Sequence, residues 1–281
     1  MKNSGNHFIA FLFCSLSVFA QNKIDRKAVV SRHNVKVNVV DTLASLSVGN
    51  GSFAFTVDAM GLQTFPDHYK NGIPLGTQSD WGWDSFSNEN NYRFEETLED
   101  YDQNGRKVSY SVQPKTPERA AKATEYFRSN PHRLQLGNLG FELYKKNGAK
   151  VKPEDITIID QTLNLWTGKI ESLFKVEGVP VTVETVSHQE EDVVGVRIKS
   201  DLIEREQLKI RLRIPYPTGE WMDTGTKWEG NQNYKSSLSQ KDKHEAVISH
   251  KMDSIHYQIG LAWEGKAEIS EESSHYFVLQ P

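Results

Sequence analysis

The feature that most limits the fold of this chain is a strict alternation of apolar and charged residues. In the segment 207–214, every even position from 208 onward is leucine or isoleucine, and Lys209, Arg211 and Arg213 stand between them. Because successive side chains of a β-strand point to opposite faces, this pattern predicts a strand. We expect its aliphatic residues to face the core and its three cations to face outward.

The same alternation recurs through the second half of the chain. It is found in the segments 179–186, 194–199, 255–263 and 276–279, which are separated by turn-forming residues at 177–178, 190–192, 215–219 and 265. Many strands at this spacing, without long helices between them, are typical of an antiparallel sandwich. The sequence therefore predicts an all-β fold.

One segment has the signals of a helix instead. Thr116 is a candidate N-cap, Pro117 fits the first helical position, and Glu118 adds an early acid. The following residues favour a helix up to Arg128, and the pair Asn130–Pro131 is expected to end it. We predict one short helix at the rim of the sheets.

The first twenty residues have the composition of an export signal. A lone Lys2 precedes the apolar run 8–20, which is too short for a stable transmembrane helix of about 20 residues. Val18 and Ala20 occupy the −3 and −1 positions of a small-residue cleavage site. We expect a signal peptide at 1–20, with residues 21–281 as the mature domain. That domain would be periplasmic or secreted, with no membrane attachment after cleavage. The alternative is an uncleaved anchor.

Composition excludes several classes of site. The single cysteine, Cys14, lies within the predicted signal, so the mature domain has no disulfide and no cysteine metal site. The net charge is near −4 and the basic residues are scattered, which argues against nucleic acid as a partner. The histidines are dispersed without a ligand-like spacing. We predict no metal site and no cofactor.

A tight turn near the start of the mature chain begins a further strand. Gly49, Asn50 and Gly51 tolerate positive φ angles and can reverse the chain sharply. The residues after them alternate, with Phe53, Phe55 and Val57 on one face. Taken alone, this turn indicates a hairpin.

Together with a later block, the turn resembles a known family. The segment 161–168, Gln-Thr-Leu-Asn-Leu-Trp-Thr-Gly, is followed by strand-like segments at 174–183 and 193–198. Their order after Gly49-Asn50-Gly51 resembles the N-terminal domain of six-hairpin glycosidases, the (α/α)6-barrel glycoside hydrolases and phosphorylases. The resemblance implies a β-supersandwich like that of galactose mutarotase.

The resemblance also implies where the chemistry lies. In that family the paired catalytic carboxylates belong to a helical barrel that follows the sandwich. Nothing in this sequence indicates a dozen barrel helices. We therefore expect residues 21–281 to be a non-catalytic domain of a glycoside hydrolase, whose partner would be a C-terminal helical catalytic domain.

Glycoside hydrolysis usually needs two carboxyl groups on either side of the scissile bond. Acidic groups occur at 95–96, 99–100 and 190–192, but all lie in hydrophilic, turn-like surroundings. Charged runs of this kind are seldom buried. We assign no catalytic residue in this chain.

The long aromatic segment 65–86 is the best candidate for ligand binding. Tryptophan rings stack on the C–H faces of sugars while short polar side chains hold the hydroxyl groups. This predicts a binding surface for an oligosaccharide or other glycan, made by Gln78, Asp80, Trp81, Trp83, Asp84 and His68. The competing interpretation is that the tryptophans fill a gap between the sheets. The polar cluster Asn130–Arg133 could lie near such a pocket.

Two other functions stay open at this point. One is a stand-alone carbohydrate-binding protein, which would use the same aromatic segment. The other is a mutarotase-like epimerase, which needs a histidine and a glutamate facing each other across a substrate. Glu184 and His188 lie four residues apart on one predicted strand, where their side chains would project in parallel. This makes the epimerase the weakest of the three hypotheses.

Overall fold

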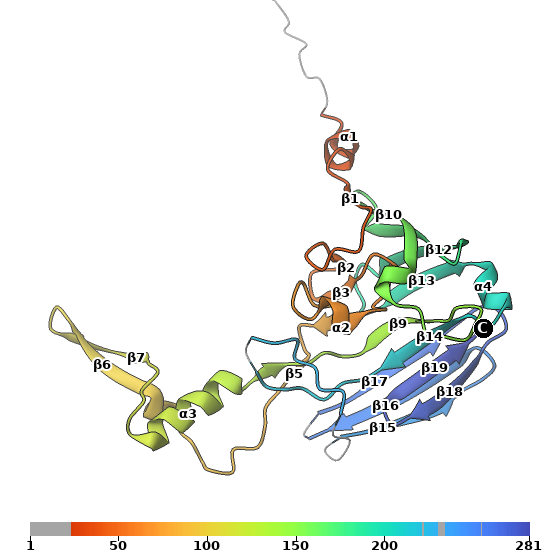
Figure 1. Ribbon diagram of the computed structural model, residues 1–281. Coiled ribbons are helices and arrows are strands. Elements are labelled where there is room, and N and C mark those ends of the chain that lie inside the picture. The colour runs from red at the N-terminus through yellow and green to blue at the C-terminus, as the bar shows by residue number, and fades with distance from the viewer. Residues whose placement is uncertain (1–23, 221, 230–233, 254) are drawn as a thin grey trace, which may run out of the picture.

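The computed structural model describes residues 24–220, 222–229, 234–253 and 255–281. The predicted signal peptide, residues 1–20, lies outside them. Antiparallel sheets are the main regular structure of the described chain, as the sequence predicts, and the fold is an all-β sandwich (Figure 1). None of the helices in the described part of the chain is both long and apolar enough to span a membrane.

A five-stranded antiparallel sheet forms one outer layer (Figure 1). In spatial order its strands are β1 (Val35–Val37), β10 (Ile156–Asn164), β11 (Lys169–Val176), β12 (Val179–Ser187) and β13 (Val194–Lys199). Val181 and Val183 of β12 are buried, while Thr182 between them is exposed. This is the pattern that the alternation of the sequence predicts for a sheet with one face in the core.

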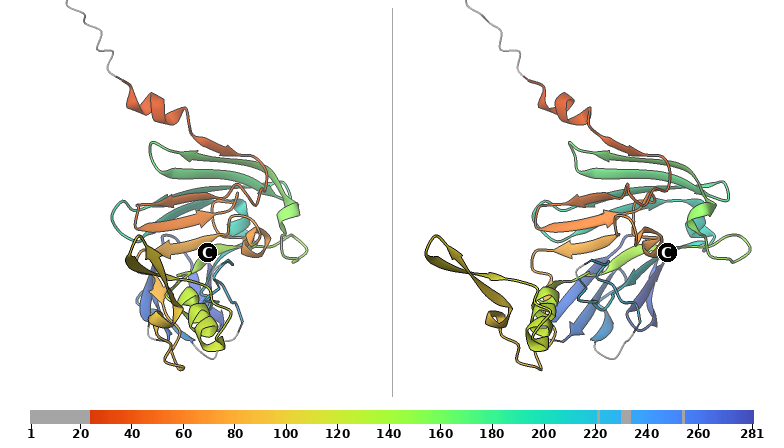
Figure 2. Two further views of the ribbon diagram at one scale, coloured as in Figure 1. Left: turned by 90° about the vertical axis from the view of Figure 1, so that its left-hand side faces the viewer. Right: turned by 60° about the vertical axis from the view of Figure 1, so that its left-hand side comes forward.

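Two further sheets lie beneath this layer (Figure 2). The first is a three-stranded sheet, in the order β2 (Leu46–Gly49), β3 (Phe53–Val57) and β4 (Gly76–Ser79). The second is a four-stranded sheet, in the order β18 (Glu268–Ser273), β19 (Tyr276–Gln280), β14 (Leu208–Arg213) and β9 (Asn138–Leu143). Backbone hydrogen bonds from Gln63 N to Leu139 O and from Leu136 N to Thr77 O connect the two.

A last three-stranded sheet completes the sandwich, in the order β15 (Tyr234–Gln240), β16 (Glu245–Met252) and β17 (Ile255–Ala262). The aliphatic face of β14 contributes to two cores. Leu208 packs in the core beneath the five-stranded sheet, whereas Leu212 packs with Ile248 of β16. The five-stranded sheet and the β15–β17 sheet therefore cover different parts of one apolar face.

The predicted turn at Gly49-Asn50-Gly51 joins β2 to β3. Gly51 has a φ of 103°, a conformation that favours glycine. The Asn50 side chain accepts hydrogen bonds from Ser52 N and Phe53 N at 3.0 and 2.8 Å. Phe53, Phe55 and Val57 are buried, which confirms the predicted inward face of β3.

The predicted helix is present as α3 (Glu118–Ser129), but two details of the prediction are wrong. Its N-cap is Pro117, and no side chain makes a capping hydrogen bond there. The helix also lies away from the sheets, in a projecting arm that includes the hairpin of β6 (Leu98–Gln103) and β7 (Arg106–Ser111) (Figures 1 and 2). A 3-10 turn, η1 (Phe94–Thr97), packs on α3, where Arg119 Nε and Glu96 Oε2 are 2.6 Å apart.

Short elements complete the description. They are the helices α1 (Arg26–Ser31), α2 (Pro66–Tyr69) and α4 (Asp201–Glu204), the 3-10 turn η2 (Pro153–Asp155), and the two-stranded ladder of β5 (Trp83–Asp84) and β8 (His132–Arg133). The β5–β8 ladder lies where the arm meets the sheets (Figure 1).

The outward face predicted for β14 is wrong at Arg211. This residue is 5% exposed, and its guanidinium donates to Asn138 Oδ1 at 2.6 Å and to the carbonyl oxygens of Gln63 and Thr64 at 2.9 Å each. The chain after β3 crosses this face of the sheet. Gly140 permits the crossing, because a Cβ at that position would lie 2.4 Å from Gln63 O.

The crossing segment carries a buried carboxyl group, Asp58. Its oxygens accept hydrogen bonds from the backbone N–H groups of Met60, Thr64 and Phe65 at 2.7–3.0 Å. Burial raises the pKa of Asp58 to about 7, and these three donors and Arg211 oppose that rise. We refer to Asp58, Gln63, Asn138, Gln161 and Arg211 as the buried polar cluster.

The buried polar cluster joins the layers of the sandwich. Gln161 of β10 donates to Asp58 O at 2.8 Å and to Ser172 Oγ at 2.9 Å, and Thr185 of β12 donates to Gly61 O at 2.7 Å. Arg211 connects the same crossing segment to β14. Because buried polar groups need partners, these bonds fix the position of the segment between the two sheets.

Candidate functional site

The aromatic segment predicted to bind ligand runs along β4, through a turn, and into β5. The turn is closed by a hydrogen bond from Gly82 N to Ser79 O at 3.1 Å. Trp81 and Trp83, on either side of Gly82, are 47% and 42% exposed. Their rings therefore do not fill a gap between the sheets, which was the competing interpretation of this segment.

Trp81 lies where three distant parts of the chain meet. Its indole Nε1 donates to Asp192 Oδ2 at 2.7 Å, and its ring contacts Tyr257 of β17 edge-to-face, with centroids 5.7 Å apart. Asp192 belongs to the turn between β12 and β13. The Asn50 amide donates to Glu191 O of that turn at 3.1 Å. These contacts fix the orientation of a half-exposed indole ring.

Trp83 has its own polar neighbour. The guanidinium carbon of Arg133, in the paired strand β8, lies 5.4 Å from the centre of the Trp83 ring. Arg133 also donates to Gln78 Oε1 at 3.2 Å. Two of the predicted residues, Gln78 and Trp83, are thus connected through an arginine from the polar cluster 130–133. We refer to Gln78, Trp81, Trp83, Arg133 and Asp192 as the tryptophan surface.

The other predicted site residues lie differently. Asp80 is exposed beside Trp81, and its backbone N–H donates to Ser52 O at 2.8 Å. Asp84 is only 5% exposed and pairs with His132 in the β5–β8 ladder, so it faces the interior. His68 lies on α2, which precedes β4 and whose N-cap residue, Phe65, donates to Asp58 Oδ2 at 3.0 Å, whereas Trp81 follows β4. The structure does not bring His68 together with the tryptophans.

Sequence reasoning missed Arg133, Asp192 and Tyr257 as members or neighbours of this surface. Arg133 could have been found, because it belongs to a polar cluster that the sequence does single out. Asp192 lies in an acidic turn that is exposed, as predicted, yet its carboxylate orients an indole 111 residues away. No local pattern indicates that pairing.

Members of the acidic groups noted in the sequence take part in separate local interactions. Glu96 of the arm bonds to Arg119, which lowers the pKa of this partly buried carboxyl group. Asp100 accepts from Ser109 Oγ at 2.6 Å on the β6–β7 hairpin. Asp192 is engaged by Trp81. Across the described ranges, no group of three or more candidate metal ligands comes together either.

The residues considered for an epimerase are engaged elsewhere. Glu184 lies between two cations, 3.4 Å from Lys169 Nζ and 3.5 Å from Arg197 Nη1. His188 Nδ1 accepts from the backbone N–H groups of Glu190 and Glu191 at 3.3 and 3.1 Å. The two side chains take part in separate interactions, so they do not form an acid and base across a cleft.

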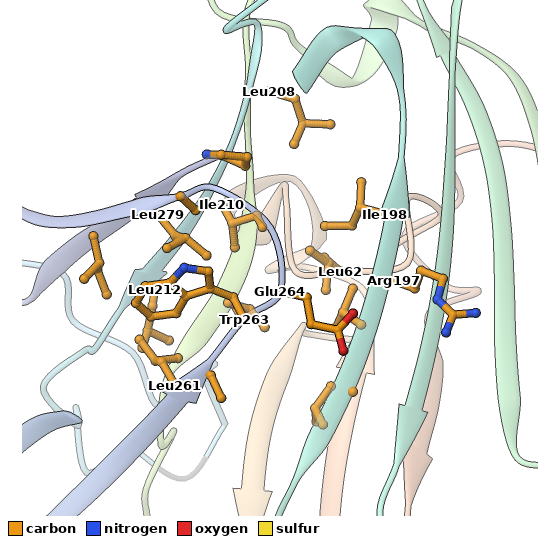
Figure 3. A pocket seen from close by; sticks show the side chains of 18 of the residues that line it. Leu62, Arg197, Ile198, Leu208, Ile210, Leu212, Leu261, Trp263, Glu264 and Leu279 are labelled. Carbon is orange, nitrogen blue, oxygen red and sulfur yellow. The ribbon is translucent and has the colours of Figure 1, made fainter. Parts of the chain in front are cut away.

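A large groove lies between the edge strands β13 and β17, each of which pairs on one side only within the described sheets. Its volume is about 850 Å³. Figure 3 shows aliphatic side chains of β14 and β19 along it, including Ile210, Leu212 and Leu279. The charged side chains of Arg197 and Glu264 are also drawn in this view. Apolar residues dominate the lining of this groove.

The groove gives a first testable expectation. The isolated chain should bind the dye ANS, because a solvated apolar groove of this size attracts apolar ligands. Replacing Val196, which lines the groove from β13, with lysine should lower ANS fluorescence by roughly twofold or more while the circular dichroism spectrum is retained. The control is Val39→Lys, at an exposed valine outside the groove. Equal fluorescence from both variants would show that the dye binds elsewhere.

No protein-family model matches the chain, and no curated protein matches it either. The resemblance to six-hairpin glycosidases therefore stays a prediction from the sequence blocks.

Proposed function

We propose that this chain is a non-catalytic, carbohydrate-binding domain of an exported glycoside hydrolase of the six-hairpin type, with the β-supersandwich architecture of that group. Its role would be to form one wall of a sugar site whose reactive carboxylates belong to a partner helical domain. The observation that carries the proposal is the tryptophan surface, in which two half-exposed indole rings adjoin an amide, a guanidinium and a carboxylate.

The chemistry of this surface suits a saccharide. An indole ring offers its face to the C–H groups of a sugar, and the loss of water from both surfaces favours the contact. Beside Trp83, Arg133 can donate to hydroxyl groups and Gln78 can donate to them or accept from them, and Asp80 lies beside Trp81. Because Asp192 already orients the Trp81 ring, less conformational freedom is lost on binding.

Two observations support a non-catalytic role with a covering partner. Glu96, Asp100, Glu184 and Asp192, from or near the acidic groups of the sequence, are each engaged in a separate interaction with a cation, a hydroxyl or an indole. The apolar groove between β13 and β17 has the character of a surface that another domain covers. A periplasmic or secreted location follows from the predicted signal peptide.

Substitution of the tryptophans tests the proposal. A screen of the purified chain against immobilised neutral glycans should identify a ligand, and titration calorimetry then gives its affinity. Trp81→Ala and Trp83→Ala should each weaken binding about tenfold or more, since a stacked aromatic anchor contributes at least 1–2 kcal/mol. Asp192→Asn should have a smaller effect, because it weakens only the bond that orients Trp81.

The matched control is Trp166→Ala. Trp166 is 48% exposed, as the two site tryptophans are, but it lies in the turn between β10 and β11. This variant should bind glycans as the wild type does. Retained affinity in both Trp81→Ala and Trp83→Ala, or equal loss in Trp166→Ala, would exclude the tryptophan surface as the binding site.

A further inference from the structure

Arg213, the last residue of β14, carries a charge that the described part of the chain leaves uncompensated. No carboxylate oxygen of the described residues lies within ion-pair distance of its guanidinium, and none of its side-chain N–H groups makes a hydrogen bond there. Among the described residues, no hydrogen-bond partner meets its buried Nε. A buried, unpaired donor costs free energy, so such a group is seldom left without a ligand or a role.

The surroundings of Arg213 are positive and aromatic. Arg211 projects from the same face of β14 two residues earlier. Burial lowers the pKa of Arg213 to about 10, with the charge of Arg211 adding to this effect and the charge of Asp67 opposing it. Two cations on one strand face repel each other, and an anion placed against the second would relieve that repulsion.

Trp228 holds the guanidinium in a defined orientation. The Arg213 Cζ atom lies 3.5 Å from the centre of the Trp228 ring, as in a stacked cation–π pair. Reciprocal backbone hydrogen bonds between Tyr216 and Lys227, at 3.0 and 2.8 Å, place Trp228 over the end of β14. Stacking of this kind leaves the edge of the guanidinium free to bind a planar anion.

We propose that Arg213 and Trp228 form a binding site for an oxyanion, a carboxylate or phosphate group carried by a small molecule. Two N–H groups of Arg213 would donate side by side to two oxygens of the anion, with the Trp228 ring fixing the plane. The positive charge of Arg211 would strengthen the attraction. The site uses none of the residues of the tryptophan surface, so it does not depend on the proposed function.

The test measures binding of defined anions to the purified chain at low ionic strength. Sodium glucuronate represents a sugar carboxylate, sodium phosphate and glucose 1-phosphate represent phosphate, and glucose is the neutral control. At least one anion should quench tryptophan fluorescence and raise the melting temperature, because a ligand that binds only the folded state stabilises it. The anion that binds most tightly identifies the source of the oxyanion.

Variants then assign the site. Arg213→Met should weaken anion binding tenfold or more, and Arg213→Lys should weaken it several-fold, because lysine keeps the charge but lacks the planar fork. Arg197→Met, at an exposed arginine on β13, should bind as the wild type does. Trp228→Leu should remove the fluorescence change. We expect Arg213→Met to fold, since the substitution removes an unpaired, partly buried charge.

The proposal is overturned if none of the anions binds, or if Arg213→Met binds them as tightly as Arg197→Met does. If Arg213→Met does not fold, the milder Arg213→Lys and Trp228→Leu variants decide the question by the same titrations. Anion binding that persists in Trp81→Ala, while neutral glycan binding is lost, would show that the two sites are separate. A negative result for anion binding therefore does not contradict the proposal of glycan binding, and a negative result for glycan binding does not contradict the anion site.

Discussion

Replacing Arg211 with methionine should lower the free energy of unfolding by about 3–5 kcal/mol, the usual cost of removing one partner from a buried charged network. The substitution leaves Asn138 Oδ1 and the carbonyl oxygens of Gln63 and Thr64 without their donor in a region closed to water. It also removes the cation near the buried Asp58 carboxyl group. Since a domain is stable by only about 5–15 kcal/mol, this variant should be marginally folded.

Urea unfolding followed by circular dichroism measures the effect. Arg211→Lys should give an intermediate loss, because one ammonium group cannot contact all three acceptors at once. Arg197→Met is the control, since this exposed arginine makes only a surface ion pair with Glu184, at 3.5 Å, and such pairs contribute less than about 1 kcal/mol. An Arg211→Met midpoint close to that of Arg197→Met would contradict the role given to the buried polar cluster.

The second large effect is on the pH dependence of stability, and it comes from His250. The Ser236 hydroxyl lies between two imidazoles, 2.9 Å from His250 Nδ1 and 2.7 Å from His275 Nδ1. Burial, together with the charges of His275 and His256, lowers the pKa of His250 to about 4. Nε2 of His250 is buried without a partner, so the charged form would bury an unpaired N–H.

The sign of the effect follows from proton binding. The unfolded chain takes up a proton at this residue near pH 6.5, whereas the folded chain does so only near pH 4. The contribution of His250 to stability is therefore fully present above pH 6.5. It is lost as the pH falls toward 4, at about 1.4 kcal/mol per pH unit and about 3 kcal/mol in all. His275, whose pKa burial also lowers, acts in the same direction.

Comparison with His250→Asn isolates this effect. The stability of the wild type relative to the variant should shrink by about 3 kcal/mol between pH 6.5 and pH 4, measured by urea unfolding at each pH. The wild type must be compared with the variant at each pH, because Asp58 acts in the opposite direction. With its pKa raised to about 7, Asp58 stabilises the fold as the pH falls over the same range. His244→Asn, at an exposed histidine just before β16, controls for the loss of an imidazole. A constant difference for His250→Asn would contradict the prediction.

The sequence predicted the sheets well because one face of each strand meets the core. Alternation shows that the two faces of a strand differ, but it does not show what the second face meets. On β12 the exposed Thr182 side chain meets water, as expected. On β14 the same pattern does not predict that Arg211 is buried. The segment after β3 crosses that face and supplies carbonyl oxygens from residues 147 and 148 positions away in the chain.

The candidate site was predictable in part, for a similar reason. Trp81, Trp83 and Gln78 are close in the chain, so composition alone could indicate an aromatic, polar surface. Asp192 and Tyr257 reach Trp81 only through the packing of the sheets. Arg213 and Trp228 likewise meet through a loop that no periodic pattern describes. Local sequence thus indicated the rings of the site but not the partners that orient them.

The arm that carries α3 and the β6–β7 hairpin enters and leaves the sandwich at neighbouring points. Trp83 and Asp84, before it, pair with Arg133 and His132, after it, and Phe86 N donates to Asn130 Oδ1 at 2.7 Å. The two ends of the arm are therefore held together by hydrogen bonds to each other. The arm is therefore an insertion between β5 and β8. A short peptide could replace it without altering the course of any sheet of the sandwich. Its length can vary among related chains at little cost to the rest of the fold.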